Sequence, residues 1–314
     1  MNTVCTIITA NYLPLAKVLH GSLQKQHPGI SLQVLVVDEH NFVSTDTFII
    51  HAIDSLANSA FFAGIQKKYG HTSPDYFRWA LKPVFIGHLL DKGYDKVLFA
   101  DPDLYFVGNF DFLFDELDKN NILLTPHWAN IDPTENEDSL LAVLKGGLYN
   151  AGFIGANKNG AGAMAWWAGL CHYKTEDLKD LGLFVDQKYL DILPVQFDNV
   201  QIIKHRGCNL ASWNIDTSKR ELIDGVLRIN KIYEPVFIHF AKDTIVNIIN
   251  KNDALLMPYL DSYTKELQQE NFDLLKTVPD IDSEIYNSSF YKIKHKVRFR
   301  TRLKRFFFKS AEKL

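Results

Sequence analysis

The sequence predicts an α/β protein with a central sheet flanked by helices. A β-branched apolar run at residues 4–9 predicts a buried strand, residues 13–26 have helical spacing with one apolar face, and residues 32–37 predict a second buried strand. This strand–helix–strand start favours parallel pairing with right-handed crossovers. Because ligands bind at the carboxyl ends of parallel strands, the residues after these strands are candidates for a binding edge. They are Thr9, Ala10, Asn11, Tyr12 and Asp38.

The rest of the chain continues the alternation. Residues 46–70 have a helical pattern with poorly defined limits, and residues 75–90 have a stronger one that follows the start signal Ser73-Pro74. An apolar strand at 96–100 then runs directly into Asp101. The remaining expected elements are a helix at 112–118, a strand at 122–125, an acidic loop at 133–138, a strand at 148–156 interrupted by Gly152 and Gly155, helices at 162–173 and from 184 to 193, strands at 200–204 and 236–240, and a helix at 253–275.

Length and composition suit one large α/β domain with a small appendage. The chain has 314 residues, of which 46% are hydrophobic and 23% charged. Its three cysteines are far apart, which predicts no disulfide framework and favours a reducing cytosol. The first ten residues contain no basic residue, so we expect no signal peptide. No apolar run approaches the roughly 20 residues of a membrane-spanning helix.

The basic residues are concentrated at the C-terminal end. The net charge is −3, but residues 291–314 contain ten Lys or Arg and one acidic residue, so this segment carries +9 and the rest about −12 (−3 minus 9). Helical spacing places Phe299, Leu303, Phe306 and Phe307 on one stripe. A basic helix with an aromatic face suits an anionic membrane surface, where each cation contributes about 1 kcal/mol. The alternative is a solvated tail, and nucleic acid is not expected as a partner because no nucleic-acid-binding motif accompanies the charge.

These observations predict three regions and a location. We expect a catalytic domain at 1–245, a helical extension packed on it at 246–290, and a basic amphipathic tail at 291–314. The protein is expected to be cytoplasmic and peripherally associated with the inner face of the membrane.

The motif Asp101-Pro102-Asp103 lies between two apolar runs. On extended backbone, residues two apart point to the same side, and Pro102 restricts the chain between them. Converging carboxylates are costly unless a cation or hydrogen bonds compensate, and Mg²⁺ or Mn²⁺ would do so. The alternative is a solvated acidic loop, which the apolar residues 96–100 and 104–107 on both sides disfavour. A cation there would stabilise a diphosphate leaving group.

Five segments between residues 3 and 242 form an ordered set that is more specific than any one segment alone. They are Asp75 to Trp79 with Lys82-Pro83, the strand and acidic pair at 97–103, Leu148 to Ile154 with Asn150-Ala151-Gly152, the pair Asp186-Gln187, and Phe237 to Phe240 with His239. Together they resemble the GT-A fold glycosyltransferases, and most closely the bacterial surface-polysaccharide branch of glycosyltransferase family 8. The sequence departs from that family in two places. The order of Asp186-Gln187 differs, and Ala241-Lys242-Asp243 stands where Gly-x-x-Lys-Pro-Trp commonly follows.

The resemblance implies a GT-A fold with a Rossmann-like mixed sheet and a C-terminal helical extension. It also implies metal-dependent transfer of a sugar from a nucleoside-diphosphate sugar to a glycan or lipid-linked acceptor in surface-polysaccharide synthesis. UDP-sugar is the default donor, and retention of the anomeric configuration is the expected stereochemistry. An inverting enzyme would instead need a carboxylate base, for which Asp186 is the candidate.

The resemblance, together with the type and position of each residue, predicts the site residues. His239 is the expected third metal ligand, and its imidazole favours Mn²⁺ over Mg²⁺. Tyr12 would stack on a base, Asp38 would bind ribose or base, and Arg78 would neutralise the diphosphate or orient Asp101. The expected donor-binding set also includes Lys82, Pro102, Gly152 and Lys242, and the expected catalytic set is Asp186, Gln187 and Asn150. For each of these the alternative is a structural role, such as a core histidine, a surface ion pair or a bulged strand.

Tryptophan residues occur in two further segments of interest. Trp166 and Trp167 are expected in the core, whereas Trp213 is a candidate for the acceptor side.

Three other function classes compete. A sugar nucleotidyltransferase should have a Gly-rich basic loop after the first strand, and residues 9–14 contain none. A phosphatase of the Asp-x-Asp type should have Thr after the pair, where this chain has Leu104. A catalytically inactive nucleotide-sugar-binding subunit remains open as an alternative.

Overall fold

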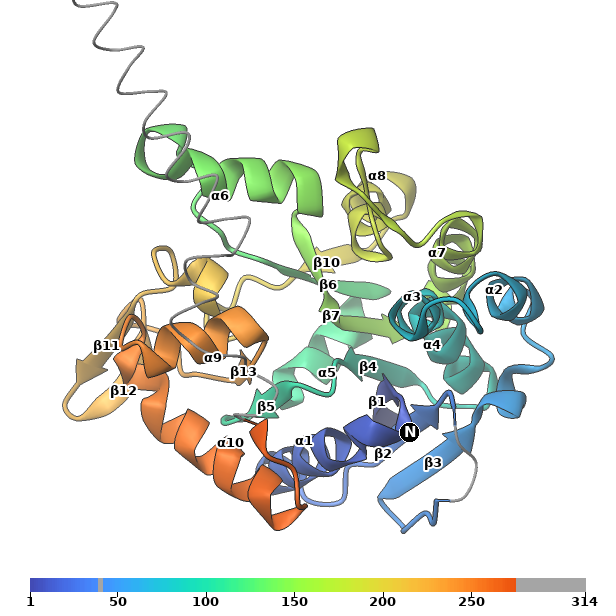
Figure 1. The fold of residues 1–314 in the computed structure, drawn as a ribbon, viewed down its shortest axis with the longest axis horizontal. Coiled ribbons are helices and arrows are strands. Elements are labelled where there is room, and N and C mark those ends of the chain that lie inside the picture. The colour runs from blue at the N-terminus through green and yellow to red at the C-terminus, as the bar shows by residue number, and fades with distance from the viewer. Residues whose placement is uncertain (39–41, 275–314) are drawn as a thin grey trace, which may run out of the picture. The chain divides into compact units, whose positions relative to one another are not determined.

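A seven-stranded sheet lies at the centre of the protein in the order β10-β6-β7-β4-β1-β2-β3 (Figure 1). The computed structural model describes residues 1–38 and 42–274. Neighbouring strands pair in parallel except β7, which runs antiparallel to both β4 and β6. The strands are β1 (Asn2–Ile8), β2 (Leu32–Val36), β3 (Phe48–Ala52), β4 (Lys96–Ala100), β6 (Ile122–Pro126), β7 (Tyr149–Asn157) and β10 (Val200–Ile202). The α/β class with a mixed central sheet is therefore confirmed.

Helices cover both faces of this sheet. Alternate residues of the central strands face opposite layers, so Val97 and Phe99 join one core cluster while Leu98 and Ala100 join the other. The first cluster lies under α2 (Phe62–Tyr69), α3 (Pro74–Ala80), α4 (Lys82–Asp91) and α7 (Ala161–Tyr173), and the second under α1 (Leu13–Gln26) and α5 (Asp111–Lys119). Burial on both faces explains why these strands are continuous apolar runs in the sequence.

The C-terminal part of the described chain adds small sheets and short helices. β5 (Leu104–Phe106) pairs with β13 (Phe237–His239), which brings the predicted late strand next to the acidic motif. The remaining elements are α6 (Pro133–Gly146), β8 (Asp177–Leu178), β9 (Leu183–Phe184), α8 (Leu193–Gln196), the hairpin β11 (Arg220–Ile223) and β12 (Val226–Ile229), α9 (Lys242–Ile249) and α10 (Met257–Gln269).

Several of the sequence predictions for individual elements are wrong. The segment 184–193 is not one α-helix, because Phe184 ends strand β9 and residues 187–192 form a 3₁₀ helix before α8 begins at Leu193. The segment 46–70 is not all helical, because Phe48–Ala52 pairs with β2 as β3 before α2 begins. The segment 75–90 forms two helices that meet at Leu81, with Pro83 in the first turn of the second. The expected loop at 133–138 begins α6, where Asp132 caps the helix by accepting a hydrogen bond from the Thr134 N–H. β7 continues through both of its glycines.

The domain boundaries at 245 and 290 stay predictions. Met1–Phe272 form one compact unit that contains α9 and α10, and of the following unit, Asp273–Leu314, only the first two residues are described. The basic segment 291–314 lies outside the described residues. Within 1–38 and 42–274, no helix is both long and apolar enough to cross a membrane.

The central strand β4 allows a direct test of this core. Leu98 is fully buried, so Leu98→Ala should lower the free energy of unfolding by about 2–5 kcal/mol, through lost apolar contact and a residual cavity. Leu144 on α6 is 59% exposed, and Leu144→Ala should change the free energy of unfolding by less than about 0.5 kcal/mol. Urea unfolding of both variants measures the difference, and equal effects would contradict this description of the core.

Candidate metal centre and adjoining pocket

The acidic motif forms a turn at the carboxyl end of β4. The Leu104 N–H donates to the Asp101 carbonyl over 3.0 Å, so residues 101–104 are not extended as the sequence argument assumed. Two further hydrogen bonds hold the turn. The Asp101 N–H donates to the Gly152 carbonyl of β7 over 2.8 Å, and the Phe240 N–H donates to the Asp103 carbonyl over 2.9 Å. The two carboxylates therefore converge because a turn is anchored on both sides.

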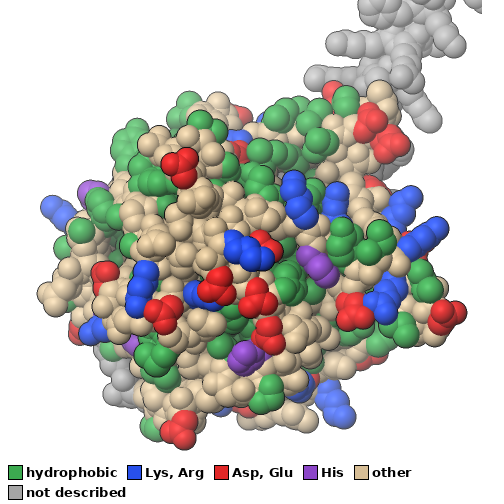
Figure 2. Space-filling view, turned by 180° about the vertical axis from the view of Figure 1, so that it is seen from behind, with side chains coloured by type: hydrophobic (Ala, Val, Ile, Leu, Met, Phe, Trp, Pro, Cys, Tyr) green, Lys and Arg blue, Asp and Glu red, His purple; other side chains and the backbone are tan. Residues whose placement is uncertain are grey.

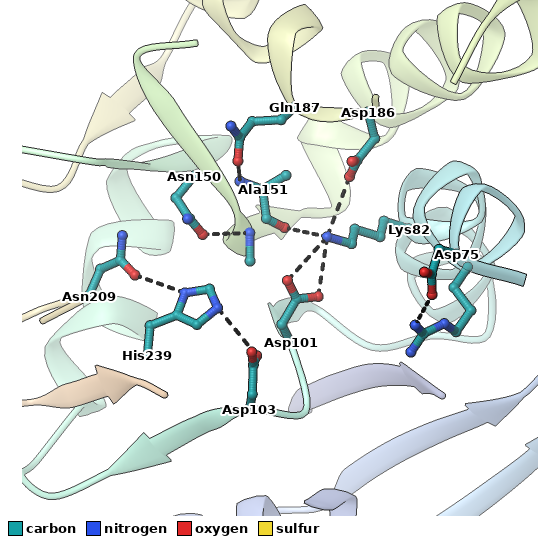
Figure 3. Close-up of polar contacts among 12 residues, drawn as sticks. Asp75, Lys82, Asp101, Asp103, Asn150, Ala151, Asp186, Gln187, Asn209 and His239 are labelled. Carbon is teal, nitrogen blue, oxygen red and sulfur yellow. Dashed lines mark hydrogen bonds and ion pairs between the residues drawn. The ribbon is translucent and has the colours of Figure 1, made fainter. Parts of the chain in front are cut away.

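Asp101, Asp103 and His239 come together at this turn (Figure 3). One ligand atom from each residue lies within 4.8 Å of the others. His239 Nε2 is 3.2 Å from Asp103 Oδ1, and its Nδ1 is 3.2 Å from Asn209 Oδ1. An Nδ1–H that donates to Asn209 orients the ring and leaves Nε2 facing the carboxylates, as in many histidine metal ligands. The three side chains could hold a divalent cation.

The electrostatics of the cluster agree with this geometry. Burial lowers the pKa of His239, but the neighbouring Asp103 carboxylate outweighs burial and raises this pKa above its usual value. Burial raises the pKa of Asp103, and His239 reverses this effect so that the net pKa is lowered. Both partners are therefore stabilised in their charged forms, and the site favours positive charge beside its carboxylates.

Lys82 of α4 places a buried ammonium beside the same cluster. Its side chain is 3% exposed, and Nζ lies 3.2 Å from Asp101 Oδ1, 3.4 Å from Asp186 Oδ2 and 3.0 Å from the Ala151 carbonyl. Burial lowers the pKa of Lys82, but Asp101 and Asp186 outweigh burial and raise it. Burial raises the pKa of Asp186 to about 6, although Lys82 acts in the opposite direction.

β7 brings Asn150 and Gly152 to the centre. A Cβ atom on Gly152 would lie 2.6 Å from Asn150 Oδ1, 2.7 Å from His239 Cε1 and 2.9 Å from Asp101 Oδ2, so only glycine fits there. Asn150 Oδ1 accepts a hydrogen bond from the Gly152 N–H over 2.7 Å, and its Nδ2 is 3.3 Å from His127 Nε2. The absence of a side chain at 152 keeps the space between the ligands open.

A cavity of about 270 Å³ opens beside the cluster. Arg78 lies over the Tyr12 ring, with Cζ 4.7 Å from the ring centroid, and forms an ion pair with Asp75. The cavity is lined by Ile7, Tyr12, Asp75, Arg78, Trp79, Lys82, Phe99, Asp101, Pro102 and Asp103. Figure 2 shows acidic and basic side chains close together in the middle of one face of the molecule, with apolar side chains along its upper part.

Most predicted site residues meet at this centre. Tyr12, Arg78, Lys82, Pro102 and both motif aspartates line the cavity, and Asn150, Gly152, Asp186 and His239 adjoin it. Thr9, Ala10, Asn11 and Asp38 follow strands β1 and β2 but do not line it; Asp38 accepts a hydrogen bond from the Ala10 N–H, and the Thr9 hydroxyl donates to Asn11 Oδ1.

Gln187 and Lys242 do not line the cavity either, although Gln187 contacts strand β7 beside Asn150. The Gln187 amide already bonds to the Ala151 N–H and the Gly146 carbonyl, and Lys242 is an exposed residue at the start of α9.

The contacts of Asn209 and His127 with site residues were not predicted from the sequence. Asn209 orients His239 and adopts a left-handed backbone conformation with φ 61°, which Asn tolerates better than most residues. The segment Gly207-Cys208-Asn209 was a weak signal for such a turn. His127 follows β6, and nothing in its local sequence indicates that it contacts Asn150.

Sequence comparison finds one similar curated protein, which matches part of the chain. No family model matches the chain. The uncharacterized protein YfnD of Bacillus subtilis (strain 168) is 31% identical over 189 residues, which are 58% of this chain and 58% of that protein. The chain therefore matches less than two thirds of the length of that relative.

Comparison with solved structures finds similar folds. The apo form of mouse xyloside xylosyltransferase 1 is 14% identical, with a TM-score of 0.48 over 78% of this chain and 99% of that chain. The galactosyltransferase LgtC, in complex with donor and acceptor sugar analogues, is 18% identical, with a TM-score of 0.45 over 77% and 87%. The glycosyltransferase GlyE of Streptococcus pneumoniae TIGR4 is 16% identical, with a TM-score of 0.40 over 76% and 54%. Because these sequence identities and TM-scores are low, the likeness carries no argument about function.

A substitution at Gly152 tests whether the cluster binds a cation. Because a Cβ atom would press on His239, Asn150 and Asp101, Gly152→Ala should weaken Mn²⁺ binding about tenfold or more. Isothermal titration with MnCl₂ measures the change. Gly162→Ala is the matched control, because a Cβ atom at that position meets nothing within 4 Å. Unchanged Mn²⁺ affinity in a folded Gly152→Ala protein would contradict the assignment.

Proposed function

We propose that this protein is a metal-dependent glycosyltransferase. It would move a sugar from a nucleoside-diphosphate sugar, with UDP-sugar as the expected donor, to a glycan or lipid-linked acceptor in surface-polysaccharide synthesis. One observation carries the proposal. Asp101, Asp103 and His239 converge at the carboxyl edge of the sheet, beside a cavity that contains the cations of Arg78 and Lys82. Such an edge is where α/β proteins bind their ligands.

The donor set of the cluster fits Mn²⁺ or Mg²⁺. Two carboxylates supply hard oxygen ligands, and the imidazole of His239, oriented by Asn209, favours Mn²⁺. When bound, such an ion neutralises the charge that develops on a diphosphate leaving group. Asp101, Asp103 and His239 would hold it, and Gly152 would leave room for it.

The cavity residues suit a nucleoside diphosphate. Arg78 Nε is buried without a hydrogen-bond partner among the described residues, and such an unpaired donor can bind a phosphate oxygen. Tyr12 offers an aromatic surface to a base, and Asp38, which accepts a hydrogen bond from the Ala10 N–H, is proposed to contact the donor together with Thr9, Ala10 and Asn11. Lys242, at the N-terminal end of α9, is proposed to contact the diphosphate.

The sugar would lie toward β7 and Asp186. Asn150 and Gly152 face the metal cluster, and the Asp186 carboxylate is held behind it by Lys82. With its amide bonded to Ala151 and Gly146, Gln187 fits a positioning role for the strand that carries Asn150. We propose that the acceptor attacks from the leaving-group side, with retention of configuration.

The location of the enzyme is proposed from the sequence. The basic segment 291–314 would bind the anionic inner face of the membrane and hold a cytoplasmic enzyme there. Its nine interleaved cations are Lys292, Lys294, Lys296, Arg298, Arg300, Arg302, Lys304, Arg305 and Lys309.

Donor hydrolysis tests the function. With Mn²⁺ present, the purified protein should slowly hydrolyse a UDP-sugar, and Asp103→Asn should reduce this rate by on the order of 100-fold because a metal ligand is lost. Asp118→Asn is the control, because Asp118 is a 61% exposed residue that pairs with Lys96. Chromatography of released nucleotide measures both rates across a panel of nucleotide sugars.

The outcomes separate the competing functions. Binding of a nucleotide sugar without hydrolysis or transfer would favour an inactive binding subunit. Formation of a nucleotide sugar from a nucleoside triphosphate and a sugar 1-phosphate would indicate a nucleotidyltransferase. No response to any nucleoside diphosphate would overturn the proposal.

The stereochemistry has its own test. If the enzyme retains configuration, the sugar first released from an α-linked donor should be the α anomer, because the bond to the leaving group breaks and the bond to the incoming oxygen forms on the same face of the sugar ring. Proton NMR during the first minutes, before mutarotation, reads the anomer directly. A β anomer as the first product would exclude retention and direct attention to Asp186 as a base.

A further inference from the structure

Two cations lie against one tryptophan at the end of β6. Arg206 Cζ is 3.5 Å from the centroid of the Trp128 ring, and Lys204 Nζ is 5.7 Å from the same centroid. Both cations come from the segment that follows β10. Cation–aromatic contact of this kind stabilises each cation by about 1 kcal/mol, but it does not neutralise the charge.

No carboxylate balances this pair among the described residues. Arg78, Arg220 and Arg228 each form an ion pair with an acidic side chain, whereas Arg206 and Lys204 form none. Arg206 Nη1 is buried without a hydrogen-bond partner in the described part of the chain. Burial lowers the pKa of Arg206, and the opposing effect of Tyr233 is smaller. A buried guanidinium N–H of this kind is a ready donor for an anion.

The tryptophan is joined to the metal cluster by a chain of contacts. His127, which precedes it, has Nε2 3.3 Å from Asn150 Nδ2. The Trp213 ring lies edge-on to both His127 and His239, at centroid distances of 5.6 and 5.2 Å. Trp213 Nε1 is a further buried donor without a partner within the described ranges. Trp128 therefore directly follows a residue that contacts Asn150 beside the metal cluster.

This region is separate from the donor cavity. None of Trp128, Lys204, Arg206 and Trp213 lines the cavity that contains Arg78. In Figure 3, His239, Asn209 and Asn150 lie on one side of Asp101, whereas Lys82, Asp186 and Asp75 lie on the other. His127 contacts Asn150 of the first group, and Trp128 directly follows His127, so we infer that the Trp128 segment approaches the metal cluster from the side away from the proposed diphosphate site.

The backbone at Trp128 is strained. Its φ of 55° lies in the left-handed region, which is unfavourable for a bulky side chain, and the Thr217 hydroxyl donates to its carbonyl. Strained backbone of this kind occurs more often at functional sites than elsewhere. Here it holds the indole ring against two cations beside the reaction centre.

We propose that this cluster of Trp128, Lys204 and Arg206 is an acceptor subsite that binds an anionic group. The acceptor would be a sugar that carries a carboxylate or a phosphate next to the hydroxyl that is glycosylated. The pyranose lies near Trp128 and Trp213, and the anion binds Lys204 and Arg206. The proposal rests on the proposed function, since it names the class of acceptor for the same site.

Binding of three small probes tests it. Glucose, glucuronic acid and glucose 1-phosphate are titrated into the full-length protein saturated with Mn²⁺ and UDP, and the Kd of each is measured by NMR. At least one anionic probe should bind roughly tenfold more tightly than glucose. Tighter binding of glucuronic acid identifies a carboxylate subsite, and tighter binding of glucose 1-phosphate identifies a phosphate subsite.

Charge-removing variants assign the effect to these residues. Lys204→Gln and Arg206→Gln should each remove most of the preference for the anion, while Arg206→Lys should retain part of it. Lys219→Gln is the control, because Lys219 is an exposed lysine outside both this cluster and the donor cavity, and it should leave the anion preference and donor hydrolysis unchanged. Lys204→Gln also keeps the test decisive if Arg206→Gln fails to fold.

Two results would overturn the inference. One is equal affinity for glucose and both anions, and the other is a full preference for anions that survives both Lys204→Gln and Arg206→Gln. Donor hydrolysis in the same preparations distinguishes the two levels of proposal. Hydrolysis without anion preference removes the acceptor subsite alone, whereas absence of nucleotide binding removes the proposed function itself.

Discussion

The site depends on one buried cation, the ammonium of Lys82. It contacts the turn after β4 through Asp101, strand β7 through the Ala151 carbonyl, and the 3₁₀ helix Gln187–Ile192 through Asp186 at its start. Without this charge, two partly or fully buried carboxylates would face each other unbalanced, and breaking such a buried pair costs about 3–5 kcal/mol. Lys82 thus holds three segments together while leaving Asp101 able to bind a second cation.

The antiparallel strand β7 explains how distant residues reach this point. Ala100 at the end of β4 pairs with Phe153, so the residues just before Phe153 extend past the carboxyl edge of the parallel strands. Asn150 and Gly152 therefore lie beside Asp101 because the strand runs in the opposite direction. A parallel strand in the same position would have placed its later residues there instead. The reversal of one strand is what combines the acidic turn with an Asn-x-Gly segment.

The sequence predicted what depends on local pattern. Buried runs such as Val97 to Ala100 are apolar on both faces, so the strand and the acidic residues after it could be located directly. It could not predict that β3 would replace a helix at Phe48–Ala52, because pairing with β2 overrides the local helical pattern. Asn209 and His127 were missed for a related reason. Their importance lies in contacts with His239 and Asn150, which are remote in sequence and meet only in the fold.

The arginines on the two sides of the metal cluster differ in how their charge is balanced. Arg78 in the donor cavity is paired with Asp75 on its own helix, so a diphosphate bound there must share this cation with a carboxylate. A divalent ion on Asp101, Asp103 and His239 would supply the additional positive charge that a diphosphate needs. Arg206 and Lys204 have no carboxylate among the described residues and no metal cluster of their own. A ligand with a single anionic group would be balanced by these two cations alone, and this difference in charge would distinguish the proposed donor side from the proposed acceptor side.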